Sequence, residues 1–244
     1  MLVDAHCHID LCERPVQEIV NKDMLIVANG VDLVSNKKVL SYAKLFPNVK
    51  AAIGIYPQQV VERSKKEVAE TLKFIEDNKD KIVAIGEVGI DFYHITNQDQ
   101  QTKEIEGFKK IIKLANKIKK PIIVHSRKAT ETALNLLKNA KVPIIMHCFD
   151  GNAEQTEEAL KRGYYFTIPA NFWTRKGFKK TAKRVPIDRL LTETDSPYLS
   201  PIEGENRPQN IKYSIEKLAA LKNMTSQQVE NQIYINFKKM FINL

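Results

Sequence analysis

Six side chains that could bind a metal ion occupy equivalent places along the 244-residue sequence. Each lies at the end of a short apolar run, and together they comprise four of the five histidines and two acidic residues: His6, His8, Glu87, His125, His147 and Asp195. Imidazole nitrogens and carboxylate oxygens form ligand sets that suit zinc, manganese, iron or cobalt, and they hold magnesium more loosely. The pattern therefore predicts either one tightly held ion or two ions that share a bridging ligand.

The apolar runs have the composition of buried strands. They are continuous rather than alternating, which is typical of strands covered on both faces. Strands are expected at residues 2–6, 24–30, 51–55, 82–88, 121–125, 143–147, 164–168 and 189–195. Helical patterns separate most of them, at roughly 35–46, 64–78, 99–119, 127–140, 152–162 and 172–184, and a final helical stretch lies near 209–242. Ser126 and Asn152 are expected to cap two of these helices.

Eight strands that alternate with helices indicate an α/β fold with a parallel sheet, and the count favours a single (β/α)8 TIM-like barrel with a C-terminal helical extension. We expect residues 1–244 to form one such domain. An open doubly wound sheet is the alternative, but no G-x-G-x-x-G sequence follows the first strand. In a barrel the carboxyl ends of the strands meet at one rim. The six side chains should therefore converge there, with Cys7 pointing away from its histidine neighbours.

Composition narrows the surroundings in which this protein works. No apolar run approaches the roughly 20 residues that span a bilayer, so no membrane segment is expected. The first residues lack the basic and apolar segments of an export signal. The three cysteines, Cys7, Cys12 and Cys148, do not form a disulfide framework, which fits a reducing compartment. These features predict a cytoplasmic protein.

The formal net charge of +9 favours an acidic polymer over a cationic substrate. Four basic residues after the seventh predicted strand are candidates for contacts with a nucleic-acid backbone: Arg175, Lys176, Lys179 and Lys180. The simpler interpretation of these lysines is a solvated helix surface. Trp173 nearby is expected to pack against its neighbours, and His94 is expected at the surface or beside a substrate.

Five motifs, HCHID, GEVGIDFY, PIIVHSRKA, MHCFDG and ETDSPYL, closely resemble those of the TatD family of metal-dependent deoxyribonucleases and related hydrolases. That family belongs to the amidohydrolase superfamily of barrels. The motifs occur in order from residue 3 to about residue 208. The resemblance implies two divalent ions, of zinc, manganese or magnesium, with Glu87 bridging them. The other ligands that it implies are His6, His8 and Asp195 for one ion, and His125 and His147 for the other.

The resemblance also implies roles beyond metal binding. Asp195 would accept the proton of the attacking water, Arg127 would contact a substrate phosphate, and Asn206, in an N-x-P element, would help to bind substrate. The chain departs from the family where a G-I-H-P segment is common after the third strand, because GIYPQ stands there and supplies Tyr56 and Gln58. This departure affects no implied metal ligand but does affect the expected substrate contacts.

The function that the resemblance implies is hydrolysis of ester bonds in DNA. Such a deoxyribonuclease would cleave phosphodiesters, in the manner of a 3′–5′ exonuclease, with a water activated by two metal ions. The first alternative is an amide or lactone hydrolase of the same superfamily, in which a carboxylated lysine commonly bridges the metals where this chain has Glu87. The second alternative is a metal-binding interaction protein with little catalysis.

Overall fold

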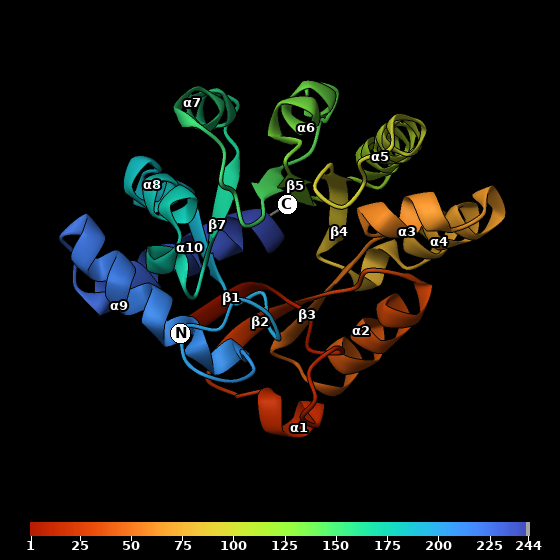
Figure 1. Cartoon of the computed structure of the whole chain (residues 1–244). Coiled ribbons are helices and arrows are strands. Elements are labelled where there is room, and N and C mark those ends of the chain that lie inside the picture. Colours follow the sequence, from red (N-terminus) through yellow and green to blue (C-terminus); the bar gives the residue numbers. More distant parts are fainter. Residues whose placement is uncertain (243–244) are drawn as a thin grey trace.

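The protein folds as an eight-stranded parallel barrel surrounded by helices, as seen in a computed structural model that describes residues 1–242 (Figure 1). Each strand pairs in parallel with the next one along the chain, from β1 to β8. The strands are β1 (Leu2–Cys7), β2 (Met24–Asn29), β3 (Val49–Ile53), β4 (Ala84–Asp91), β5 (Ile122–Arg127), β6 (Ile144–Met146), β7 (Tyr165–Pro169) and β8 (Leu190–Glu193). The predicted α/β barrel is confirmed.

The barrel closes where the end of β8 meets β1. The backbone N–H of Asp195 donates a hydrogen bond to the carbonyl oxygen of His6 at 3.0 Å, and the N–H of His8 donates to the carbonyl oxygen of Ser196 at 2.7 Å. Deeper in the barrel, the hydroxyl of Thr192 donates to the carbonyl oxygen of Val3 at 2.6 Å. These bonds join residues that lie about 190 positions apart in the sequence.

The helices lie around the outside of the strands (Figure 1). They are α1 (Val16–Ile19), α2 (Leu33–Leu45), α3 (Pro57–Glu62), α4 (Lys65–Asp77), α5 (Gln98–Ile118), α6 (Thr130–Leu137), α7 (Ala153–Lys161), α8 (Lys176–Arg184), α9 (Ile211–Lys222) and α10 (Ser226–Phe241). Short 3₁₀ turns occupy Lys79–Lys81, Phe172–Thr174, Ile187–Arg189 and Pro208–Asn210. Among the helices of residues 1–242, none combines the length and apolar character needed to cross a bilayer.

Apolar side chains position these elements. All eight residues of β4 are buried, as expected for a strand covered on both faces. On α5, Phe108, Ile111, Ile112 and Ala115 are buried at the spacing of one helix face, while lysines occupy the other face. The core thus fills the barrel and the space between its strands and helices.

The structure differs from the predicted elements in four places. Ser126 lies inside β5, and α6 begins only at Thr130, so the predicted cap is wrong, whereas Asn152 caps α7 through a capping box. The stretch near 209–242 is two helices, because Asn223 takes a left-handed conformation (φ 53°) that ends α9. The helix expected from 172 starts at Lys176, after a 3₁₀ turn. The short α1 and α3 were not expected.

Candidate metal centre

All six predicted ligands meet at the carboxyl-terminal rim of the barrel. Three of them lie within strands, namely His6, Glu87 and His125. The other three lie one or two residues after the ends of β1, β6 and β8, namely His8, His147 and Asp195. Four are almost completely buried, while the side chains of His125 and Asp195 keep 13% and 15% of their surface exposed. The donor atoms of these six side chains form overlapping groups of three, each compact enough for one ion.

Glu87 lies between two pairs of imidazoles. Its Oε2 is 3.2 Å from Nε2 of His8 and 3.6 Å from Nε2 of His6. Its Oε1 is 2.8 Å from Nδ1 of His125 and 3.6 Å from Nε2 of His147. Each carboxylate oxygen therefore faces a different pair, which is the arrangement that a ligand shared by two ions requires.

Asp195 completes the cluster from the other side of the barrel. Its Oδ1 lies 3.5 Å from Nε2 of His6, 3.6 Å from Nε2 of His8 and 3.8 Å from Nε2 of His147. The residue adopts a left-handed backbone conformation (φ 56°), which aspartate tolerates better than most residues. Its backbone N–H is fixed by the carbonyl oxygen of His6, so this turn aims the carboxylate at the rim.

The spacing of the donors fits divalent ions. Two ligands of a tetrahedral ion, each about 2.1 Å from the metal, lie about 3.4 Å apart. The distances from Glu87 Oε2 to the nitrogens of His6 and His8, 3.6 and 3.2 Å, bracket this value. One ion would be held by the group of His6, His8, Glu87 and Asp195, and a second by the group of Glu87, His125 and His147.

Three of the imidazoles are oriented for metal binding by hydrogen bonds on the side that faces away from the cluster. Nδ1 of His8 donates to the carbonyl oxygen of Asn29 at 3.0 Å, and Nδ1 of His147 donates to Oε2 of Glu193 at 2.7 Å. In His125 the roles are exchanged, because Nε2 donates to a carboxylate, Oδ2 of Asp91, at 3.1 Å. With a metal bound, each bond would keep a hydrogen on the outer nitrogen and leave the lone pair of the cluster-facing nitrogen free for the ion. Such partners are typical of histidine ligands.

Asp91 is the centre of a further network at the rim. Its Oδ2 accepts hydrogen bonds from His125, from Nδ1 of His94 at 2.6 Å and from the hydroxyl of Tyr56 at 3.1 Å. Burial alone would raise the pKa of Asp91, but these imidazole hydrogen bonds outweigh it and lower the pKa below its usual range. His94 and Tyr56 therefore help to hold His125 in place, and both line the cavity above it.

The charges of the cluster support metal binding. Burial would raise the pKa of Glu87, but the His147 imidazole and the hydrogen bond from His125 keep it well below its usual range. The carboxyl pKa of Asp195 is lowered in the same way by His6 and His8, again against the effect of burial. Burial would lower the pKa of His125, yet Asp91 and Glu87 raise it to about 9. Both carboxylates are thus ionised at neutral pH, and metal binding would displace protons from imidazoles.

A cavity of about 670 Å³ lies above the six ligands. The predicted phosphate contact, Arg127, lines it, and its guanidinium stacks 3.8 Å above the centre of the Tyr93 ring. Arg175, Tyr198 and Gln58 also line this cavity. The departure from the family pattern after the third strand therefore places Tyr56 and Gln58 in the lining of this cavity.

Asn206, the second predicted substrate contact, does not reach the cavity. It is fully buried, and its amide donates to the carbonyl oxygens of Thr194 and Tyr198 at 2.7 and 2.6 Å. Its side-chain oxygen accepts hydrogen bonds from Asn210 and from the backbone N–H of Arg207. In the structure Asn206 therefore braces the segment that carries Asp195.

The remaining candidates are placed as follows. Cys7 is buried, and its thiol donates to the carbonyl oxygen of Val27 at 3.6 Å, away from the ligands as expected. Cys148 is half-buried, packs against the core and also lines a small hollow beside His147. Trp173 packs against the core with Phe172, as expected.

Sequence reasoning missed the outer partners Asn29, Asp91 and Glu193. A signal was available for the two acidic residues. Asp91 lies four positions after Glu87, and Glu193 lies two positions before Asp195, so the alternation of an extended chain predicts that each points to the same side as a predicted ligand. Asn29 accepts the hydrogen bond of His8 through its backbone carbonyl oxygen. Every residue has such a group, so the sequence gives no signal for this contact.

The fold and the donor set define the class of this protein: an α/β barrel with a candidate metal centre at the carboxyl-terminal rim of its strands. Within this class, the chain belongs to the family described as TatD related DNase, whose model matches residues 3–242.

Two curated relatives and one solved structure show the range of this similarity. A relative named as the uncharacterized metal-dependent hydrolase MJ1582 of Methanocaldococcus jannaschii is 34% identical over 98% of this chain and 96% of its own. The human deoxyribonuclease TATDN3 is 30% identical over 98% of this chain and 88% of its own. The crystal structure of YJJV, a TatD homolog from Escherichia coli, superimposes with a TM-score of 0.86 over 98% of this chain and 97% of that chain, at 23% identity, which supports the fold.

Proposed function

We propose that the protein is a metal-dependent hydrolase that cleaves phosphodiester bonds in DNA, removing nucleotides from the 3′ end. The observation that carries the proposal is the position of Glu87, which turns one oxygen toward each pair of imidazoles. The names of two relatives support it, because one is a metal-dependent hydrolase and the other a deoxyribonuclease. The three cysteines are unpaired, which supports the cytoplasmic location predicted from the sequence.

Two divalent ions in such a site supply Lewis-acid stabilisation of phosphoryl oxygens and lower the pKa of water toward neutrality. The protein contributes the remaining chemistry. Asp195 is ionised and borders the cavity, so its carboxylate accepts the proton of the attacking water. The forked guanidinium of Arg127 pairs with the non-bridging oxygens of the phosphate. Stacking on Tyr93 restricts the guanidinium to the cavity mouth.

The test uses protein stripped with a chelator and reloaded with zinc, manganese or magnesium. A single-stranded oligonucleotide labelled at its 5′ end should yield a ladder that shortens from the 3′ end. Asp195→Asn should reduce turnover by about 10²–10⁴-fold, the usual contribution of a general base. Glu87→Gln should also reduce the bound metal measured by elemental analysis. Asp188→Asn, which changes an exposed carboxylate in the 3₁₀ turn before β8, is the control and should retain activity.

Parallel assays decide between this function and its alternatives. Hydrolysis confined to an amide and lactone panel, with no cleavage of DNA, would refute the nuclease and favour the first alternative. Metal-loaded protein that hydrolyses none of these substrates would favour an interaction protein. Near-normal turnover of DNA by Glu87→Gln would show that the proposed bridge is not part of the machinery.

A further inference from the structure

Helix α8 presents a row of cations to a hollow beside the candidate metal centre. The helix carries five basic residues and no acidic one. Lys176, Lys180 and Lys183 lie at helical spacing on one face and line a hollow of about 800 Å³ that α8 forms with residues 150–153. All three are exposed, and within residues 1–242 no carboxylate lies close enough to pair with them. Arg184 lines the same hollow and pairs with Glu157 at 3.7 Å.

Another hollow lies between this one and the cavity above the metal ligands, and it shares lining residues with both. This intermediate hollow measures about 550 Å³, shares Asp150 with the hollow beside α8, and is also lined by Arg127 and Arg175. Both arginines in turn line the cavity that contains Glu87. Two carboxylates, Asp150 and Glu131, border the middle of the path, where Lys128 joins the two arginines and the cations are in excess.

Exposed aromatic rings stand where this path meets the metal centre. Tyr93 is 52% exposed and stacks on Arg127, and Tyr198 is 55% exposed with its ring centre 6.4 Å from that of His8. Proteins that bind single strands combine a basic groove, which follows the backbone, with aromatic rings on which bases stack. The path has both components, in the order that a strand with its end at the metal centre would meet them.

We propose that the path from Arg127 and Arg175 along α8 binds the phosphate backbone of single-stranded DNA, several nucleotides away from the bond that is cleaved. The proposal rests on the proposed function, because it takes the reacting end of the strand to lie over the ligand cluster. Lys176, Lys180 and Lys183 each contact one phosphate, and Tyr93 and Tyr198 flank the bases nearest the rim. Lys179 points elsewhere, since it does not line the hollow.

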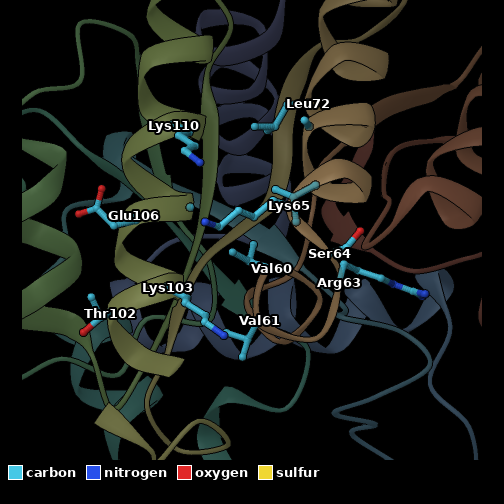
Figure 2. A pocket seen from close by; sticks show the side chains of 13 residues that line it. Val60, Val61, Arg63, Ser64, Lys65, Leu72, Thr102, Lys103, Glu106 and Lys110 are labelled. Carbon is cyan, nitrogen blue, oxygen red and sulfur yellow. The ribbon is translucent and has the colours of Figure 1, made fainter. Parts of the chain in front are cut away.

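A second hollow provides a matched control. It measures about 560 Å³, lies between α3, α4 and α5, and is lined by Lys65, Lys103 and Lys110 (Figure 2). These three lysines are exposed, and within the described part of the chain none makes an ion pair. The hollow shares no lining residue with the cavity above the ligands, and its helices lie on the other side of the barrel from α7 and α8 (Figure 1).

The first measurement is binding of a fluorescent twelve-residue oligothymidylate to chelated protein, followed by anisotropy as monovalent salt is varied. Each phosphate contact with a single strand contributes about −0.7 to the slope of log K against log salt. Replacing Lys176, Lys180 and Lys183 by glutamine together should therefore flatten the slope by about 2 and weaken binding about 100-fold at 0.1 M salt. The same change at Lys65, Lys103 and Lys110, which removes equal charge, should leave the slope unchanged. Glutamine is a good helix former, and thermal melting checks that both variants are folded.

The second measurement separates this inference from the proposed function. With metal-loaded protein, the α8 variant should lose at least tenfold in kcat/KM for the twelve-residue strand, while kcat/KM for a dinucleotide stays within twofold of the parent. An unchanged salt slope in the α8 variant, or an equal loss in the control variant, would overturn the proposal. If the parent cleaves no DNA but the α8 variant still flattens the slope, the proposed function fails and the binding path stands.

Discussion

The hydrogen bond between Glu193 and His147 allows a selective test of the candidate metal centre. Glu193 is fully buried, and its two oxygens are divided between two donors: Oε2 accepts from Nδ1 of His147 at 2.7 Å, and Oε1 accepts from the backbone N–H of Cys148 at 3.0 Å. In Glu193→Gln one oxygen becomes an NH₂ group. If NH₂ faces His147, the imidazole must move its hydrogen to Nε2 and loses the lone pair that faces the cluster. If the NH₂ group faces Cys148 instead, it meets the backbone N–H of Cys148, and two donors face each other without an acceptor.

The size of the effect follows from the type of bond that is lost. A buried hydrogen bond to a charged group contributes about 1.5–3 kcal/mol, and each 1.4 kcal/mol corresponds to a factor of ten in affinity. Glu193→Gln should therefore weaken metal binding by about 10–100-fold, as is usual for an outer partner of a histidine ligand. Only the ion held by Glu87, His125 and His147 should be affected, because Glu193 contacts no other ligand imidazole in the described residues.

A competition titration against a chromophoric chelator measures the two affinities separately, and elemental analysis after dialysis gives the metal content. The parent should retain two ions per chain under conditions in which Glu193→Gln retains one. Glu104→Gln is a matched control, since it also changes a buried carboxylate but one that bonds only to the backbone N–H of Asp91. Two unchanged affinities in Glu193→Gln, or an equal fall in both, would refute the assignment of His147 to one of two ions.

Two further predictions concern folding stability. Burial raises the pKa of Glu104 from 4.5 to about 7, so its contribution to stability is complete below pH 4.5 and is lost as the pH rises through 7. The free energy of unfolding, measured in urea, should therefore fall less between pH 5 and 8 in Glu104→Gln than in the parent, by at most about 3 kcal/mol. An equal fall in both proteins would contradict this. Gly89 has φ 147°, and a Cβ there would lie 2.0 Å from the carbonyl oxygen of His125. Gly89→Ala should lower the free energy of unfolding in urea by more than about 3 kcal/mol. Gly163→Ala, whose added Cβ meets no neighbour, should lower it by only about 1–2 kcal/mol. Equal losses in the two variants would contradict the clash at Gly89.

Residues at strand ends made the rim predictable from the sequence. His6, His125 and His147 each end a continuous apolar run, and parallel strands bring such ends together whatever the details of packing. The same logic placed Glu87 and Asp195 beside them. The prediction depended only on the strands being parallel, which the alternation of strand and helix patterns in the sequence indicates.

Features that depend on tertiary contacts could not be predicted. Asn206 belongs to an N-x-P element that suggested substrate contact, yet its amide is used by two carbonyl groups that only the folded loop brings within reach. Ser126 precedes a helical pattern and looked like a cap, but pairing with β4 extends its strand to Arg127. Likewise Asn223 ends α9 by a backbone conformation that local composition permits without requiring. In each case neighbouring elements overrode the local preference.

The junction of β8 with β1 has a consequence for how the site comes into being. His6 and His8 lie near one end of the sequence, and the segment with Asp195 that hydrogen bonds to them follows almost 190 residues later. Contacts between such distant positions form late in folding, because a long loop must close first. A chain still emerging from the ribosome therefore carries two histidines long before their carboxylate partner exists. Full metal occupancy in the cell would thus be a property of finished molecules, and loading with metal would report that the last strand has docked.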